Sequence, residues 1–359
     1  MPNMPSTESA INQIPKELIG SGYICNTPAL ATTWQLLQEE VPVNLHSEVA
    51  NSCFVLLKPD ILASRKEESL WERLLEAGTQ PLIAWVCLHS GLREFEELYK
   101  FNLTLHNEQC MLSSWWLHNL PYQMGPVICL LIRVPTEVRR EVTASDFIAK
   151  LKGPSNPFLA TNGHWRHDMV STNMALNLVH SSDDPISSIW EFRIFGSSEF
   201  LKRALERSHA LNVGTASEEV VVTTVHNEFR IAVDLAGYPH HDLDLVSNLI
   251  RLKLRLVEAI APNVWISDEL TKGYRELLRG TGTAGERWHR YKSLCEIEQQ
   301  RYRQVSCPEI LSELAKTATY RPELSDILAA EMRRHRLPYS DWERIVIETT
   351  FFFHKHLPS

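Results

Sequence analysis

Asn177-Leu178-Val179-His180-Ser181-Ser182-Asp183 is the stretch on which the interpretation of this chain depends, and Glu191 follows the histidine at a distance of eleven residues. Imidazole has an ordinary pKa near neutrality, so it can act as a nucleophile without a metal or a strong base. A carboxylate that accepts a hydrogen bond from one ring nitrogen leaves the other nitrogen free to attack. The alternative is structural, because Ser or Asp followed by Pro is an ordinary helix start. Local spacing alone favours a histidine that caps a helix beginning near Asp183-Asp184-Pro185.

The composition is that of a folded protein. Its 359 residues, 44% hydrophobic and 22% charged, indicate two domains, or one domain with substantial extensions. A net charge of -8 leaves no global basic field for nucleic acid, although a local cluster of cations would suffice for a nucleotide. There is no signal-peptide pattern and no apolar run of membrane-spanning length. Seven scattered Cys without a CxxC pair are typical of buried thiols in a reducing compartment, so we expect a cytoplasmic protein with no membrane partner.

Hydrophobic patterning predicts alternating strands and helices from residue 53 to residue 195. The predicted strands are Cys53–Leu57, Pro81–Leu88, Val127–Val134 and the short Arg193–Phe195. The predicted helices are Glu67–Ala77, Glu94–Phe101, a short one from Trp115, Ser145–Leu151, residues 171–177 and Ile186–Phe192. This alternation indicates an α+β fold in which helices cover one face of a small sheet.

The two ends of the chain differ from this central part. Residues 1–48 form a leader of mixed character, and the chain from residue 209 is expected to be mainly helical, although Val220–Val225 favours a short strand or a buried turn. Gly280–Gly285 lacks the Lys-Ser/Thr ending of a P-loop, so a flexible connection is preferred over a phosphate cradle. His240-His241-Asp242 is interpreted as a turn and helix cap rather than a metal site. We therefore expect a leader (1–48), an α+β domain (49–208) and a mainly helical domain of unknown role (209–359).

Five short motifs occur in the order found in nucleoside diphosphate kinases, and residues 50–200 resemble that family. The motifs are Lys58-Pro59-Asp60, Met124-Gly125-Pro126, Gly153-Pro154-Ser155-Asn156-Pro157, Gly163-His164-Trp165-Arg166, and the set Asn177, His180, Ser182, Asp183 and Glu191. The resemblance implies a ferredoxin-like βαββαβ domain. It also implies a phosphotransferase that moves the γ-phosphoryl group of a nucleoside triphosphate, through a phosphohistidine, to a nucleoside diphosphate or related acceptor. Mg²⁺ on the nucleotide phosphates would assist.

The resemblance assigns roles by matching positions. His180 would be the nucleophile, Glu191 its orienting partner, and Ser182 the support of that carboxylate. The residues expected to bind nucleotide are Lys58 and Asn177 (ribose and reacting phosphate), Ser155 and Arg166 (β- and γ-phosphates), and Trp115 or Trp116 (stacked over the base). A place in the helix core is an equal alternative for the two Trp residues. No metal-ligating side chain is predicted.

Several positions depart from the family pattern. Where the family carries a second phosphate-binding Arg, this chain has Ala149, with Lys150 and Lys152 nearby; a Lys keeps the charge but loses the bidentate fork. Ser181 replaces a Gly and is expected to crowd the approaching phosphate, and one inserted residue before His180 is expected to displace Arg166. These departures support a second hypothesis, a nucleotide-binding sensor with weak or no turnover and output through the helical C-terminal domain. Family members assemble as hexamers or tetramers through this domain, so the resemblance implies a homo-oligomer as a partner, although the long C-terminal segment is large enough to block that surface.

Overall fold

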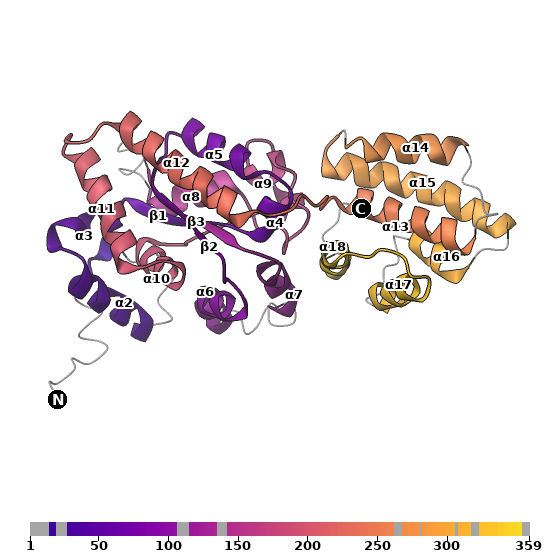
Figure 1. The fold of residues 1–359 in the computed structure, drawn as a ribbon, viewed down its shortest axis with the longest axis horizontal. Helices are drawn as coiled ribbons and strands as arrows, with labels where there is room; N and C mark the ends of the chain where they lie inside the picture. Colours follow the sequence, from indigo (N-terminus) through magenta and orange to yellow (C-terminus); the bar gives the residue numbers. More distant parts are fainter. Residues whose placement is uncertain are drawn as a thin grey trace. The chain divides into compact units, whose positions relative to one another are not determined.

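The computed structural model describes residues 14–18, 27–105, 115–134, 142–261, 268–280, 282–305, 308–316 and 323–353. Contacts within the chain divide it into two compact units, which Figure 1 shows as ribbons. The first unit comprises Met1–Gly153, Gly163–Trp165 and Leu178–Pro239, and the second comprises Pro154–Asn162, Arg166–Asn177 and His240–Ser359. The expected segment boundaries at residues 49 and 209 stay a prediction about domains.

The first unit is built on an antiparallel sheet that has four strands among the described residues. The strands are β1 (Ser52–Leu57), β2 (Gln80–Cys87), β3 (Val127–Arg133) and β4 (Val179–Ser181). Their order in the sheet is β2-β3-β1-β4, and every neighbouring pair is antiparallel. Helices connect β1 to β2 and β3 to β4, which gives the ferredoxin-like βαββαβ arrangement. The predicted fold class, an α+β domain followed by a mainly helical region, is confirmed.

Helices cover both faces of this sheet, not one face as expected. Successive side chains of a strand point to opposite faces. On one face, the Phe54 ring of β1 packs against Phe192 of α10 (Pro185–Phe195). On the other face, the Cys53 thiol lies against Ser145 of α8 (Ala144–Lys152). Because both faces are covered, the side chains of β1 and β3 are buried at every position.

The other elements of the first unit surround this core. They are η1 (Lys16–Leu18), α2 (Thr27–Glu40), η2 (Val43–Leu45), α3 (His46–Val49), α4 (Pro59–Ala63), α5 (Glu67–Glu76), α6 (Leu92–Leu105), α7 (Trp115–Asn119), η4 (Leu120–Gln123), α11 (Ser198–Asn212) and α12 (Glu218–Ala236). Two short elements, η6 (Pro157–Leu159) and α9 (Trp165–Asp168), lie in the loops between α8 and β4.

The second unit is helical throughout its described C-terminal part. Its helices are α13 (Leu245–Ile260), α14 (Asp268–Leu278), α15 (Ala284–Gln304), α16 (Glu309–Ala315), α17 (Glu323–Arg334) and α18 (Asp341–Phe352). A buried ion pair joins two of them, because Lys253 Nζ of α13 lies 2.5 Å from Glu298 Oε2 of α15 and both side chains are 1% exposed. The Tyr302 hydroxyl donates to the other oxygen of Glu298 at 2.8 Å.

Three predictions of local structure were wrong. The fourth strand is Val179–Ser181, while Arg193–Phe195 forms the last turn of α10. Val220–Val225 lies in α12, whose N-cap Ser217 accepts a hydrogen bond from the Val220 amide. Residues 171–177 are not helical, because the Asn173 side chain accepts hydrogen bonds from the amides of Ala175 and Leu176. No helix in the described ranges is long and apolar enough to cross a membrane.

Candidate active site

The segment that enters β4 is held in a strained conformation. Leu178 has a φ of 72°, in the left-handed region that costs an L-residue about 1–2 kcal/mol. Two hydrogen bonds fix it: the Leu178 amide donates to Asp60 Oδ2 at 2.8 Å, and the Lys58 amide donates to the Leu178 carbonyl at 3.0 Å. Strain of this kind persists only where surrounding contacts over-determine it, and it concentrates at functional sites. The Lys58-Pro59-Asp60 motif therefore sets the backbone two residues before His180.

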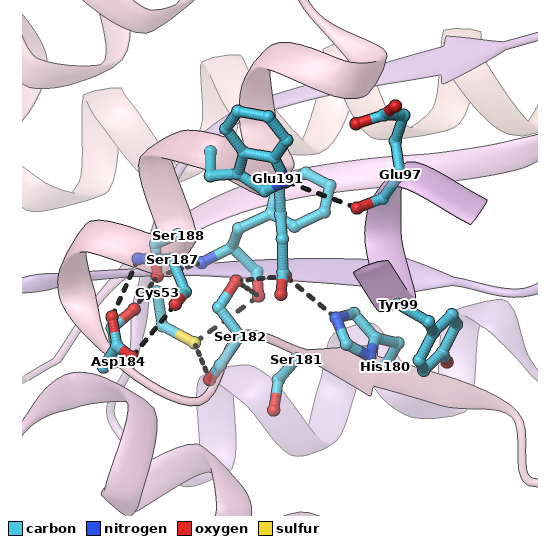
Figure 2. A network of polar contacts seen from close by, with 12 residues as sticks. Cys53, Glu97, Tyr99, His180, Ser181, Ser182, Asp184, Ser187, Ser188 and Glu191 are labelled. Carbon is cyan, nitrogen blue, oxygen red and sulfur yellow. Dashed lines mark hydrogen bonds and ion pairs between the residues drawn. The ribbon is translucent and has the colours of Figure 1, made fainter. Parts of the chain in front are cut away.

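His180 forms a hydrogen-bonded chain with Glu191 and Ser182, as Figure 2 shows. His180 Nε2 lies 2.8 Å from Glu191 Oε2, and the Ser182 hydroxyl donates to the same oxygen at 2.5 Å. An ionised carboxylate only accepts, so Nε2 must carry the hydrogen and the other ring nitrogen, Nδ1, presents its lone pair. Nδ1 makes no hydrogen bond to any residue that the structure describes, and the imidazole is 11% exposed. This arrangement suits a nucleophilic histidine.

Helix α10 places Glu191 opposite the histidine. Asp184 caps its first turn by accepting hydrogen bonds from the Ser187 amide and hydroxyl at 2.7 and 2.9 Å, and Pro185 takes the first helical position. Burial raises the pKa of Asp184 to about 6, although the bonds from Ser187 favour its charged form. A helix does begin at Pro185, but the alternative that His180 caps it is wrong, because Asp184 is the cap and His180 lies on strand β4.

Tyr99 of α6 lies beside the imidazole, with ring centroids 5.4 Å apart in an edge arrangement. Its hydroxyl is 3.1 Å from the hydroxyl of Tyr122, which is 1% exposed. Burial raises the pKa of the Tyr122 hydroxyl well above its ordinary value, so Tyr122 stays neutral. The pair forms one wall beside His180. No sequence pattern pointed to Tyr99 or Tyr122. Asp60 belongs to the Lys58-Pro59-Asp60 motif, but its hydrogen bond from the Leu178 amide was not predicted.

Lys58 lies on the same face of the sheet as His180. The register pairs His180 with Leu56, so their side chains share a face, and Lys58 follows Leu56 at the two-residue period of a strand. The Lys58 ammonium is 3.9 Å from Asp60 Oδ1 and 5.7 Å from the centre of the Tyr122 ring. Nearby, burial and then the Lys58 charge lower the pKa of His118 to about 4, so His118 is neutral. Lys58 thus places a cation on this face.

Ser181 does not narrow the approach to His180 as expected. It pairs with Val55, one position from the His180 pair, so its side chain points to the opposite face. There its hydroxyl accepts a hydrogen bond from Lys152 Nζ of α8 at 2.7 Å. Figure 2 shows the Ser181 and His180 side chains directed apart. Lys152, one of the two lysines near the missing Arg, therefore bonds to the reverse side of β4.

The remaining predicted residues lie in the second unit or outside the described side chains. Arg166 Nε donates to the Asn177 carbonyl at 3.3 Å, and Asn177 Nδ2 donates to the Ser155 carbonyl at 3.4 Å, so these three residues are brought together. Their participation in one site with His180 stays a prediction. Trp115 and Trp116 begin α7, but their side chains lie outside the described residues. Among the described residues, no group of three or more His, Cys, Asp or Glu side chains is placed to hold a metal ion.

Comparison with known proteins gives structural similarities only. No protein-family model and no curated protein match the chain. Among solved structures, the nucleoside diphosphate kinase of Aquifex aeolicus is 17% identical with a TM-score of 0.33, over 41% of this chain and 95% of that one. The enzyme of Encephalitozoon cuniculi is 20% identical with a TM-score of 0.34, over 40% and 88%. That of Halobacterium salinarum, in complex with CDP, is 19% identical with a TM-score of 0.33, over 40% and 86%.

Proposed function

We propose that this chain is a phosphotransferase that carries the γ-phosphoryl group of a nucleoside triphosphate on His180 and passes it to a nucleoside diphosphate or a related acceptor. The observation that supports this most strongly is that the two nitrogens of the His180 imidazole have different surroundings. Nε2 is tied to Glu191 at 2.8 Å, while Nδ1 lacks a hydrogen-bond partner among the described residues. A histidine that only stabilised the fold would have no need of a strained, over-determined backbone immediately before it.

In the proposed reaction, the Nδ1 lone pair attacks the γ-phosphorus in line with the leaving group. The bond from phosphorus to the bridging oxygen breaks, and the nucleoside diphosphate departs with the electron pair. The phosphorylated ring then carries a positive charge, which the Glu191 carboxylate stabilises across the Nε2–H bond. In the second half-reaction, a terminal oxygen of the acceptor attacks the phosphorus and the electron pair returns to Nδ1. Ser182 keeps Glu191 in place through its 2.5 Å bond.

The nucleotide contacts in this proposal come from the sequence resemblance. Lys58 would neutralise charge on the reacting phosphate, and Asn177, Ser155 and Arg166 would bind ribose and phosphate oxygens. Phosphoryl transfer depends mainly on positioning and on donors to the equatorial oxygens, which suits such a set. Mg²⁺ would enter with the nucleotide phosphates as part of the substrate, and Trp115 or Trp116 would stack over the base. The free, buried thiols Cys53, Cys87, Cys129 and Cys295 support a reducing compartment such as the cytoplasm.

A second candidate is a nucleotide sensor that binds but turns over slowly. Its support is Ala149, which stands on α8 where the family carries an Arg, and Lys152, the nearby lysine that bonds to Ser181 on the face opposite His180. Loss of one cation from the equatorial oxygens would slow transfer more than it weakens binding, because charge accumulates in the transition state. The two candidates differ in whether His180 gains a phosphoryl group.

The test is the intact mass of the protein after incubation with magnesium and ATP. The wild type is expected to gain one acid-labile phosphoryl group, and His180→Ala is expected to gain none. His89→Ala is the matched control, because this histidine is exposed and lies in the turn after β2. It should be labelled like the wild type. If none of the three proteins gained phosphate while nucleotide still bound, the phosphotransferase proposal would be rejected in favour of the nucleotide sensor.

A further inference from the structure

The outer edge of β2 is covered by side chains of two helices that follow the sheet in sequence. β2 is the terminal strand in the order β2-β3-β1-β4, and it pairs with β3 on one side. On the other side, the Ala84 amide donates to Glu228 Oε2 of α12 at 3.3 Å. The Leu82 carbonyl accepts from Arg207 Nη1 of α11 at 2.8 Å. Side chains thus supply two of the bonds that a neighbouring strand would make.

Arg207 and Glu228 also bind each other as a two-pronged pair. Arg207 Nη2 donates to Glu228 Oε1 at 2.8 Å, and Nη1 donates to Oε2 at 3.1 Å. Both side chains are about one-fifth exposed. A paired guanidinium and carboxylate together present one donor and one acceptor to a backbone, which matches the pattern of a strand edge. The pair therefore satisfies one backbone donor and one backbone acceptor of β2 without adding a strand to it.

Helix α12 is packed firmly enough to hold this pair. Its inner residues Val221, Val225, Phe229 and Ala232 are at most 6% exposed. The Phe229 ring stacks on Trp71 of α5, with centroids 4.8 Å apart. The helix packs against β2 and places Glu228 beside Ala84.

We infer that α11 and α12 form an edge cover that prevents β2 from pairing with β2 of a second copy of this chain. An uncovered apolar edge strand is a template for another strand, and natural proteins block such edges. The partner that fits is a second copy, because two identical strands running antiparallel satisfy both edges around a twofold axis. β2 spans the eight residues Gln80–Cys87, so it is long enough for such a pairing, and seven of the eight have apolar side chains or are Pro.

The experiment compares the mass in solution and the amide exchange of four proteins across a range of concentrations. The wild type should have the mass of one chain, with a protected Ala84 amide whose exchange does not depend on protein concentration. Arg207→Ala/Glu228→Ala should exchange the Ala84 amide roughly tenfold faster at low concentration. The same variant should reach twice the single-chain mass at high concentration. Arg203→Ala is the control, because Arg203 also contacts Glu228, at 3.4 Å, but is half-exposed; it should behave as the wild type.

The exchanged pair Arg207→Glu/Glu228→Arg separates edge cover from simple helix pairing. It keeps an ion pair between α11 and α12, but a Glu cannot donate to the Leu82 carbonyl and an Arg cannot accept from the Ala84 amide. We expect it to dimerise like the double Ala variant. Wild-type mass and wild-type Ala84 protection in the exchanged pair would overturn the inference. A wild type that is already dimeric, with concentration-dependent protection of the Ala84 amide, would also overturn the inference. This wild-type measurement does not depend on whether any variant folds.

Discussion

Replacing Asp60 tests whether the Lys58-Pro59-Asp60 motif holds the backbone that presents His180. Asp60 is fully buried, and its Oδ2 accepts from the strained Leu178 amide at 2.8 Å. Asp60→Ala leaves that amide buried without an acceptor, which costs about 1–3 kcal/mol. Relaxation of Leu178 from φ 72° would recover at most about 1–2 kcal/mol, but it would move the segment that enters β4.

Asp60→Asn is the matched control for the hydrogen bond. Both variants remove the negative charge 3.9 Å from the Lys58 ammonium, so that loss cancels in the comparison. The Asn side-chain oxygen can still accept from the Leu178 amide. We therefore expect the Ala variant to be less stable than the Asn variant by about 1–3 kcal/mol. We also expect its phosphorylation rate to be lower by about 10²-fold, because small displacements of a reacting group have effects of that size.

Two measurements decide this prediction. Unfolding in urea is monitored through the hydrogen exchange of the β1 and β4 amides. These amides report the stability of the first unit separately from that of the second. The initial rate of acid-labile phosphate formation reports the placement of His180. Equal stabilities and equal rates for the Ala and Asn variants would refute the role of Asp60, since the hydrogen bond to Leu178 would then contribute nothing.

Three further predictions concern the site and the helical unit. Glu191→Gln should lower the rate of His180 phosphorylation by about 10²-fold or more with unchanged nucleotide affinity, because the carboxylate that fixes the tautomer and balances the ring charge is lost; equal initial rates would count against it. Burial raises the pKa of Asp184 from 3.8 to about 6, so the folded protein holds a proton that the unfolded chain has released in that range. The stability of the wild type should therefore fall by up to roughly 3 kcal/mol as the pH rises from about 4 to about 6, whereas Asp184→Asn should lack this fall in urea titrations at each pH. Lys253→Met should destabilise the second unit by about 3–5 kcal/mol by leaving Glu298 unpaired, and Lys253→Met/Glu298→Gln should recover much of that loss; a double variant as unstable as the single one would contradict the assignment.

Long apolar runs made most of the sheet predictable from sequence. β1, β2 and β3 are continuous hydrophobic segments, and the structure places them within one or two residues of the predicted bounds. β4 was missed because it is only three residues long, Val179–Ser181, and two of these are polar. Its identity depends on pairing with β1, a contact distant in sequence that no local pattern reports.

Tertiary packing overrode local propensity in α12. The run Val220–Val225 has β-branched side chains throughout, which favour strands. Ser217 caps the segment, Glu218 and Glu219 occupy the first turn, and the inner residues pack against β2, so it folds as a helix. None of the packing partners lies nearby in sequence.

The contacts around His180 were predictable from the family resemblance, whereas local spacing alone favoured a helix cap. A short connection and most of α10 separate His180 from Glu191 in the chain. The predicted contact between the two side chains is present, with His180 Nε2 2.8 Å from Glu191 Oε2. Ser182 also bonds to Glu191 as predicted. Tyr99 could not be found in this way, because it reaches the site from α6 only through the fold. Asp60 was part of the Lys58-Pro59-Asp60 motif, but its bond from the Leu178 amide depends on the fold.

The most direct test of the account is the identity of the phosphorylated atom. Protein incubated with magnesium and ATP would be examined by phosphorus NMR under alkaline conditions, which preserve phosphohistidine, and by peptide mapping. We predict a single phosphohistidine at His180, substituted at Nδ1, because Nε2 is hydrogen-bonded to Glu191. A phosphoryl group on Nε2, on another residue, or on none would contradict the proposed chemistry of this site.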